Sequence, residues 1–152
     1  MEMRLLRGDE MALFYDRDLD DAFPGAELKP LRVMEDARQT GKYHPWGLFD
    51  GEDLVGGAFT WEYAPGWVLF DYLCVARHRR NDGLGAELIR RLADCERGKV
   101  LFGETEVPDC APDPEMARRR LGFYARCGLR TAGYDTEMFG VHYKTLYLAG
   151  GP

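Results

Sequence analysis

The spacing of hydrophobic residues predicts a short strand and two helices in the first part of the chain. Residues 3–7 (MRLLR) form a short apolar run that predicts a strand. In residues 8–23, apolar side chains recur at roughly helical spacing, and a Pro-Gly pair ends this pattern. Residues 26–41 predict a second helix that stops at Gly41, with Pro30 either near its first turn or breaking it.

After residue 42 the hydrophobic period changes from about four residues to about two, which is typical of strands. Residues 43–50 and 53–64 flank the sequence DGED, and this arrangement predicts a hairpin. Residues 67–75 (WVLFDYLCV) follow another Pro-Gly turn and predict a third consecutive strand. Because this strand is apolar on both faces apart from Asp71, we expect it to be central in a sheet and covered on both sides.

The second half of the chain alternates helices and strands. Residues 83–96 predict a helix, because Leu84, Leu88, Ile89 and Leu92 form one apolar stripe. The remaining predicted elements are, in order, a strand at 99–107, a helix at 115–128, and two strands at 129–139 and 141–149 that join near Gly140. The order β-α-α-β-β-β-α-β-α-β-β predicts a mixed α/β fold in one domain, residues 1–152, with a central sheet flanked by helices.

Composition and charge narrow the classes of function. Hydrophobic residues make up 45% and charged residues 30% of the chain, which is typical of a globular protein. The formal net charge of -6 argues against general nucleic-acid binding, although it is compatible with a cationic or amine-bearing substrate. Because no apolar run approaches the ~20 residues of a membrane span and the N-terminus does not resemble a signal peptide, we expect no membrane partner.

The four cysteines do not form a metal site or a redox motif in the sequence. Cys74, Cys95, Cys110 and Cys127 include no CxxC pair, and no Cys/His spacing resembles a zinc site. We therefore expect no metal, reduced thiols and a cytoplasmic location. Cys110 has no neighbouring histidine in sequence that would support a nucleophilic role.

The sequence RRNDGLGAELIRRL, residues 79–92, reverses the sign of the charge at one helix end. A helix that begins directly after an apolar strand offers free backbone N–H groups and a positive dipole end to an anion. Gly83 and Gly85 have no Cβ at positions where a ligand could approach the backbone, and only Asp82 and Glu87 oppose the local positive charge. The arginines around this turn are Arg77, Arg79, Arg80, Arg90 and Arg91. A phosphate-bearing ligand explains this pattern economically.

Other glycine-rich motifs fit this turn less well than a phosphate site does. A dinucleotide fingerprint needs a third small residue, but Leu88 occupies that position. A P-loop needs Lys-Ser or Lys-Thr after its last glycine, whereas Ala86 and Glu87 follow here. Glycine turns without any ligand and solvated surface arginines are also common, so the spacing alone leaves both readings open.

Three motifs resemble the GNAT superfamily of N-acyltransferases. The segment LCVARHRRNDGLGAELI (73–89) resembles the acyl-CoA-binding segment of that family, in which a strand precedes Arg/Gln-x-x-Gly-x-Gly/Ala at the start of a helix; Arg80, Gly83 and Gly85 match it. FYARCGL, residues 123–129, resembles the Phe-Tyr-x-x-x-Gly-hydrophobic signature of a later helix. TEV (105–107) resembles the strand between them, and the order of elements agrees along nearly the whole chain.

The chain departs from the family pattern at three positions. Asn81 stands where the family often has Gly, and Arg77 replaces a frequent Pro. Ala117 replaces an Asn that often lies seven residues before the helix tyrosine. The last difference removes one expected cofactor contact but does not affect the expected GNAT-like fold, with its mixed, mostly antiparallel sheet.

The resemblance implies that acetyl-CoA or a related acyl-CoA is the cosubstrate. The backbone of Leu73, Cys74 and Val75 would pair with the pantetheine arm, and one N–H there would meet the thioester oxygen. Nearby arginines, Arg80 among them, would reach the remaining phosphates. The backbone amides expected to hold the pyrophosphate are those of Asn81, Asp82, Gly83, Leu84, Gly85 and Ala86.

The chemistry of amine acetylation requires a base. An alkylamine has a pKa near ~10.4, so freeing its lone pair at pH 7 costs about 4.6 kcal/mol. The resemblance makes Glu106 the first choice of base, because the family often has Glu at this position. Glu104 lies two residues earlier and faces the same side of the strand, so either carboxylate could serve. Both could instead be surface charges or bind an arginine.

The leaving thiolate requires a proton, and Tyr124 is the candidate acid. A thiol near pKa ~8.5 and a phenol near ~10 differ by only about 2 kcal/mol, so the transfer is feasible. The alternative is a helix aromatic that packs in the core. Attack would be direct, in a ternary complex with a small-molecule amine or a protein amino group. His142 is a second candidate base, although a lone strand histidine is more often structural.

Two other functions are compatible with the sequence. The chain could be a non-catalytic acyl-CoA-binding sensor, or an interaction domain that binds no nucleotide. We expect most aromatic residues of the strands to pack the sheet, with a few lining the acceptor pocket. Exposed strand edges in the terminal hairpin make a homodimer plausible.

Overall fold

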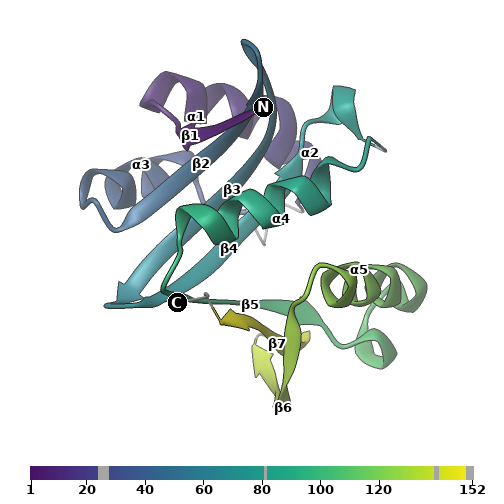
Figure 1. Ribbon diagram of the computed structural model, residues 1–152. Helices are drawn as coiled ribbons and strands as arrows, with labels where there is room; N and C mark the ends of the chain where they lie inside the picture. The colour runs from purple at the N-terminus through teal and green to yellow at the C-terminus, as the bar shows by residue number, and fades with distance from the viewer. Residues whose placement is uncertain (24–27, 81, 139–140, 150–152) are drawn as a thin grey trace.

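The computed structural model describes residues 1–23, 28–80, 82–138 and 141–149 (Figure 1). One seven-stranded sheet has the order β1-β2-β3-β4-β5-β7-β6. The strands are β1 (Glu2–Leu5), β2 (Tyr43–Asp50), β3 (Asp53–Ala64), β4 (Trp67–Val75), β5 (Val100–Glu106), β6 (Arg130–Met138) and β7 (Val141–Ala149). Neighbouring strands are antiparallel except for β4 and β5, which are parallel.

The helices occupy the predicted places between the strands. They are α1 (Gly8–Phe14), a π-helical turn (Tyr15–Leu19) that leads into α2 (Asp20–Ala22), α3 (Leu31–Gln39), α4 (Leu84–Cys95) and α5 (Pro114–Arg126). Short 3-10 turns lie at Arg77–Arg79 and Pro108–Cys110. The element order confirms the predicted mixed α/β fold with a mostly antiparallel sheet.

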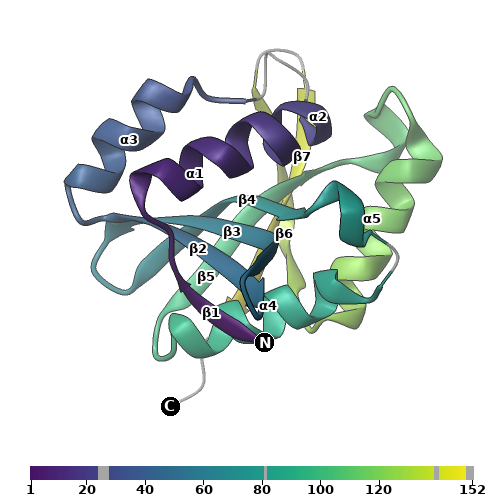
Figure 2. The same ribbon diagram turned by 90° about the horizontal axis from the view of Figure 1, so that it is seen from above.

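The sheet separates two hydrophobic cores (Figure 2). Helices α1–α3 cover one face, where Met11 and Phe14 pack with Tyr72 and Cys74 of β4. Helices α4 and α5 cover the other face, where the apolar stripe of α4 packs with Val68 and other strand residues. The face with α1–α3 is called the first face below, and the face with α4 and α5 the second face.

Most predicted boundaries agree with the structure, and the second helix is the main exception. It begins at Leu31 rather than near residue 26, because Pro30 has extended backbone angles and precedes the first turn. The three central strands have the predicted bounds of 43–50, 53–64 and 67–75. The predicted junction at Gly140 lies outside the described residues.

Strand β4 is central in the sheet, as expected, but its beginning is not covered on both faces. Trp67 is 50% exposed and Leu69 is half-buried. Helices α1–α3 pack over the later part of the strand, near Tyr72 and Cys74. The expectation that residues 67–75 are covered on both sides is therefore wrong for the first few residues.

A β-bulge at Asp71 changes the direction of the side chains in β4. The register pairs Tyr72 with Phe59 and Phe70 with Thr60, so Asp71 is an extra residue on this strand. Consequently Phe70 packs on the second face, whereas Tyr72 packs on the first. The bulge lies next to the point where β4 and β5 separate.

Strands β4 and β5 pair only at their beginnings. The pairs are Trp67 with Val100, Val68 with Leu101, and Leu69 with Phe102, after which the strands diverge (Figure 1). A Cβ atom on Gly103 would overlap the ring of Phe70. Because Gly103 has no side chain, the Phe70 ring can lie over β5 at the first position beyond the pairing. The diverging strands leave a cleft between the two halves of the sheet.

Candidate active site

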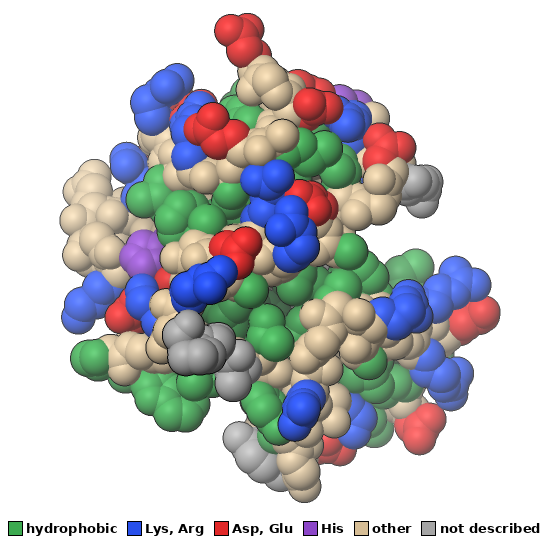
Figure 3. Space-filling model, in the orientation of Figure 1, with side chains coloured by type: hydrophobic (Ala, Val, Ile, Leu, Met, Phe, Trp, Pro, Cys, Tyr) green, Lys and Arg blue, Asp and Glu red, His purple; other side chains and the backbone are tan. Residues whose placement is uncertain are grey.

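The cleft between β4 and β5 has a volume of about 790 Å³. Figure 3 shows the hollow, with hydrophobic side chains at its floor, between α4 above and α5 below. Its walls are residues 69–75 of β4 and 104–106 of β5, joined by residues of α2, α5 and β7. Since the described pairing of β4 with β5 ends at Leu69, the later part of this edge of β4 presents backbone N–H and C=O groups to the cleft.

Leu73, Cys74 and Val75 all line the cleft, and their side chains are held by the two cores. Cys74 is buried against the first face, while Leu73 and Val75 pack against the second. Burial raises the pKa of the Cys74 thiol to about 11, so this thiol stays protonated at neutral pH. The backbone of these residues, rather than the thiol, is therefore the group that can bind a ligand.

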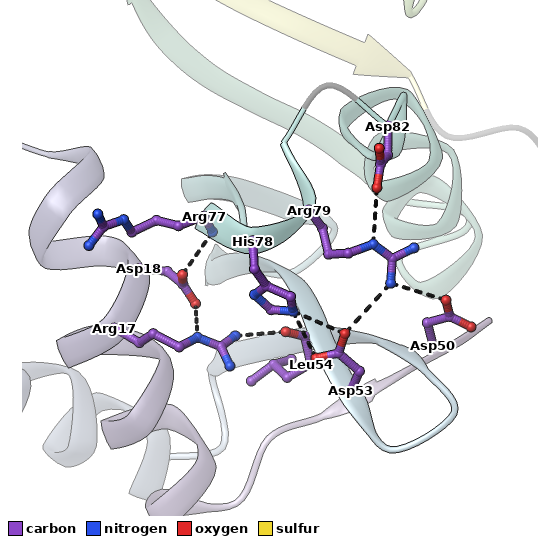
Figure 4. Close-up of polar contacts among 9 residues, drawn as sticks. All are labelled: Arg17, Asp18, Asp50, Asp53, Leu54, Arg77, His78, Arg79 and Asp82. Carbon is purple, nitrogen blue, oxygen red and sulfur yellow. Dashed lines mark hydrogen bonds and ion pairs between the residues drawn. The ribbon is translucent and has the colours of Figure 1, made fainter.

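A buried carboxylate holds the turn that follows β4. Asp18 is fully buried and accepts a hydrogen bond from the backbone N–H of Arg77 at 3.0 Å (Figure 4). The second Asp18 oxygen accepts from Nε of Arg17 at 2.7 Å, and Arg17 Nη2 donates to the carbonyl of Leu54 at 2.7 Å. The π-helical turn is thus tied both to β3 and to the start of the turn before α4.

The arginines around this turn are paired with carboxylates. Arg79 binds Asp82 through Nε at 3.0 Å and Asp50 through Nη1 at 3.1 Å (Figure 4). Arg77 and Arg80 lie 3.6 and 3.3 Å from Asp21. Besides the local carboxylates Asp82 and Glu87, this charge is therefore opposed by Asp21 and Asp50, which come from distant parts of the sequence.

Farther along α4, Glu87 pairs with two of the remaining arginines. Hydrogen bonds from Arg90 and Arg91 lower the pKa of Glu87 to about 2. Both arginines therefore compensate a carboxylate on their own helix. Of the five arginines, Arg80 is the one that lines the cleft.

Gly83 and Gly85 are glycines for different structural reasons. Gly83 precedes α4 with φ of 75°, a left-handed conformation that favours glycine, and space for a Cβ atom is open there. At Gly85, a Cβ atom would lie 3.0 Å from the ring of Phe123. Gly85 therefore allows close packing of α4 on α5, which corrects the expectation that it serves close approach of a ligand.

The remaining residues of the expected phosphate site lie at the start of α4. Leu84, Gly85 and Ala86 form its first turn, where backbone N–H groups have no partner within the helix. Asp82 holds Arg79 through its carboxylate and is not among the residues that line the cleft. Asn81 lies outside the described residues.

Glu104 and Glu106 line the cleft from β5. Leu101 packs in the second core, so the alternate residues Phe102, Glu104 and Glu106 project from the first face. Within the described part of the chain, neither glutamate side chain forms a hydrogen bond or an ion pair. The alternative in which they bind an arginine therefore does not match this structure.

Tyr124 lines the cleft from α5, on the second face. Its ring centre lies 6.3 Å from that of Phe70 and 5.7 Å from that of Phe123, so the ring also packs in the core. Burial raises the pKa of Tyr124, while the positive charge of Arg120 acts in the opposite direction. The hydroxyl group thus keeps its proton at neutral pH. Tyr124 and the two glutamates approach the opening from opposite faces of the sheet.

Four charged residues that line the cleft are not among the predicted site residues, namely Asp21, Lys29, Asp71 and Arg120. Arg120 lies one turn before Tyr124 and has no carboxylate partner among the residues that the structure describes. Asp71 accepts hydrogen bonds from Nζ of Lys29 at 2.6 Å and from the hydroxyl of Tyr43 at 3.0 Å. Two features of the sequence could have indicated two of these residues. Arg120 lies at helical spacing from Ala117 and Tyr124, and Asp71 is the lone charge in β4.

The described ranges contain no group of three or more His, Cys, Asp or Glu side chains that could hold a metal ion. None of the helices described there is both long enough and apolar enough to cross a membrane.

Comparison with known proteins gives one family and many similar folds. The model of the acetyltransferase (GNAT) family matches residues 11–129. No curated protein matches the chain by sequence. A structure from Bacteroides thetaiotaomicron assigned to the GNAT acetyltransferases has a TM-score of 0.80 and 20% identity, and the match covers 100% of this chain and 88% of that one.

Two other similar structures are acetyltransferases with a known ligand or acceptor. A Salmonella typhimurium protein, solved with its cofactor acetyl-CoA, has a TM-score of 0.72 and 16% identity over 100% of this chain and 95% of that one. The ribosomal-protein-S18-alanine N-acetyltransferase of Escherichia coli has a TM-score of 0.71 and 17% identity over 99% and 95% of the two chains. At these identities the likeness shows a shared fold.

Proposed function

Because the chain belongs to the acetyltransferase (GNAT) family, we propose that it transfers an acetyl group from acetyl-CoA to the nitrogen of a primary amine. The observation that carries this proposal is the opening between β4 and β5. One wall is a strand edge with free backbone groups, and candidate proton-transfer groups approach from opposite faces. The similar fold of the Salmonella typhimurium protein solved with acetyl-CoA supports this choice of carrier.

The residues of the cleft fit such a carrier. Backbone groups of Leu73, Cys74 and Val75 would pair with the pantetheine arm, and one N–H would stabilise the negative charge that develops on the thioester oxygen. Arg80 and the first-turn amides of α4 would bind the phosphates, because the helix N-terminus favours negative charge. These amides are those of Asp82, Gly83, Leu84, Gly85 and Ala86, together with Asn81. Acetyl-CoA supplies the activated acetyl group as a thioester.

Glu106 would accept the proton of the acceptor ammonium, and Glu104 is the second candidate for this role. Both carboxylates line the cleft and neither is neutralised by a cation among the described residues. The free amine nitrogen then forms a bond to the acetyl carbon as the carbon–sulfur bond breaks. Because both groups project from the first face, we expect the acceptor to enter from that face.

Tyr124 would give its proton to the sulfur of the leaving group. Burial keeps its hydroxyl protonated at neutral pH, so the proton is present when the thiolate forms. Its position on the second face, opposite the carboxylates, separates the acid from the base. The nitrogen loses two protons as the ammonium becomes an amide. The first passes to the carboxylate, which returns it to solvent, and the second replaces the proton that Tyr124 gives to the thiolate, so the step balances.

The test is a screen of primary amines with acetyl-CoA in which release of the free thiol is measured. For an active amine, we expect Tyr124→Phe and Glu106→Gln each to lower kcat by about 10²-fold or more. Glu52→Gln is the matched control, since Glu52 is exposed in the β2–β3 turn. CoA affinity measured by calorimetry should stay within about threefold in all variants. If Tyr124→Phe leaves kcat unchanged, the acid role is wrong; if no amine reacts although CoA binds, the chain is a non-catalytic sensor.

A further inference from the structure

Aromatic side chains form an exposed cluster where β3, β4 and β5 lie side by side. Trp61 is 43% exposed, Tyr63 54% and Trp67 50%. The ring centre of Tyr63 lies 6.3 Å from that of Trp61 and 5.5 Å from that of Phe102, and Trp67 lies 6.5 Å from Phe102. We expect most strand aromatics to pack the sheet, and these three exposed rings are exceptions. We call these four residues the aromatic platform.

The platform lies on the first face of the sheet, beyond the area that α1–α3 cover. Strand pairing places Trp61 beside Leu69, and Leu69 beside Phe102. Val68 packs in the second core, so its neighbour Leu69 faces the opposite side. Rings in mutual contact differ from single exposed apolar residues, which are common on any surface.

The platform is continuous with the acceptor side of the cleft. Leu69 lines the cleft and pairs with Phe102 of the platform. Along β5, Phe102, Glu104 and Glu106 project from the same face at intervals of ~7 Å. A ligand that extends from the reaction site along β5 therefore meets two carboxylates first and the aromatic rings next.

We propose that the platform binds an aromatic ring of the acceptor, so that the acceptor is an arylalkylamine, a primary amine joined to an aromatic ring by a short saturated chain. This inference rests on the proposed acetyltransferase function. The ammonium group complements the charge of Glu104 and Glu106, and the ring packs on Phe102 and its neighbours. A chain of about two to four carbon atoms spans the ~7 Å between Phe102 and Glu104, so the ammonium group lies beside Glu104, on the side of Glu106.

Other acceptors use these features less completely. A short aliphatic amine meets the carboxylates and leaves the rings exposed to water. An aliphatic polyamine places a second cation near Glu104, with cation–π contacts to the rings, but it buries little of their apolar area. The aromatic ring of an arylalkylamine buries that area and also forms ring–ring contacts.

The first test compares kcat/KM for phenylethylamine and phenylbutylamine with propylamine and spermidine. The expected result is a preference of about tenfold or more for the phenylalkylamines. Trp67→Ala and Phe102→Leu should lower kcat/KM for the phenylalkylamines by about tenfold and leave the value for propylamine within about twofold. Leu13→Ala is the matched control, because Leu13 is exposed at 54% on α1, away from the platform. Circular dichroism should verify that each variant is folded.

The second test measures binding without catalysis. The chain has three tryptophans, and Trp61 and Trp67 belong to the platform, so phenylbutylamine should change the tryptophan fluorescence at concentrations where propylamine and spermidine do not. The change should be lost in Trp67→Ala. Arylalkylamine binding without thiol release would contradict the proposed function but not the platform. The proposal is overturned if kcat/KM shows no preference for amines with an aromatic ring, or if it is highest for spermidine. It is also overturned if the platform variants change only self-association, as measured by sedimentation.

Discussion

Tyr124 has an apolar environment and a nearby cation, and the two have opposite effects on its hydroxyl group. Burial raises its pKa, and the charge of Arg120 lowers it by a smaller amount. The ring packs with Phe70, so it has a defined position at the point where β4 and β5 separate. The core-packing role and the proposed acid role are therefore compatible, because packing fixes the ring of a residue that also lines the cleft.

The raised pKa of Tyr124 predicts a specific loss of stability at high pH. Below about pH 10 both the folded and the unfolded chain hold the phenol proton, so this group contributes a constant amount to stability. Above the unfolded value of 10.0, the unfolded chain loses this proton while the folded chain retains it. The free energy of unfolding should then fall with rising pH, by up to about 1.4 kcal/mol per pH unit from this group.

Tyr124→Phe removes this titration. Urea denaturation of the wild type and the variant from about pH 8 to about pH 11 should give a constant difference in unfolding free energy up to about pH 10. Above that pH, the difference should shift in favour of the variant. A difference that stays constant across the whole range would mean that the hydroxyl group titrates as freely as it does in the unfolded chain.

At the scale of elements, the π-helical turn between α1 and α2 positions the turn before α4. A π-helical turn inside a helix is rare and often lies at a functional site. Here it carries Arg17 and Asp18, which bind the Leu54 carbonyl and the Arg77 N–H. The first helical segment thus supports the proposed phosphate site without lining it through these two side chains.

Removal of this anchor should affect both stability and carrier binding. Asp18→Ala leaves the Arg77 N–H and the Arg17 guanidinium without their buried partner, so we expect a loss of about 3 kcal/mol in unfolding free energy. CoA affinity should also fall, because the turn before α4 loses its anchor. Asp20→Ala is the matched control, because Asp20 is exposed and its substitution removes the same charge two residues later. Urea denaturation and calorimetry measure both effects. Equal losses in the two variants would contradict the anchoring role.

The sequence predicts local elements well because their signals are local. The bounds of β2, β3 and β4 follow from the alternating pattern and the Gly-containing turns, and all three agree with the structure. The bulge at Asp71 is not predictable in this way, because an extra residue is defined only by the partner strand. The same reason applies to Gly85, whose packing against Phe123 depends on the position of a second helix.

The sequence predicts which segments line the candidate site but not the contacts between distant residues in it. The segments that line the cleft follow from motif resemblance, and the structure brings Val75, Arg80, Glu106 and Tyr124 to one opening. The compensation of the arginines by Asp21 and other distant carboxylates is not predictable from spacing, since it depends on contacts between distant residues. The sequence does not predict which aromatic residues form the exposed platform, because exposure depends on where α1–α3 end.

At the scale of the whole molecule, two parts of the sheet meet along a short seam. Three residue pairs join β4 to β5, and beyond them the cleft separates β1–β4 from β5–β7. A carrier in this cleft would contact the free edge of β4 on one side and α5 on the other. It should therefore stabilise the folded chain as a unit and reduce local opening of both walls.

This whole-molecule effect predicts a rise in melting temperature with acetyl-CoA. At a ligand concentration 100 times Kd, binding to the folded state alone adds about 2.7 kcal/mol. For a chain of this size that corresponds to roughly 5–10 °C, which a thermal scan detects easily. Inorganic pyrophosphate at the same concentration is the control, because it tests the anion site without the pantetheine arm and should give a much smaller shift.

Hydrogen exchange then distinguishes binding in the cleft from binding at the helix end alone. With acetyl-CoA, amides of residues 69–75 and 114–126 should exchange more slowly, because one ligand contacts both walls. Amides of residues 2–5, at the far edge of the sheet, should change least. Protection limited to the first turn of α4 would mean that only the phosphates bind. If acetyl-CoA changes neither the melting temperature nor the exchange rates, the carrier does not bind in the cleft. The proposed roles of Glu106 and Tyr124 would then be wrong as well.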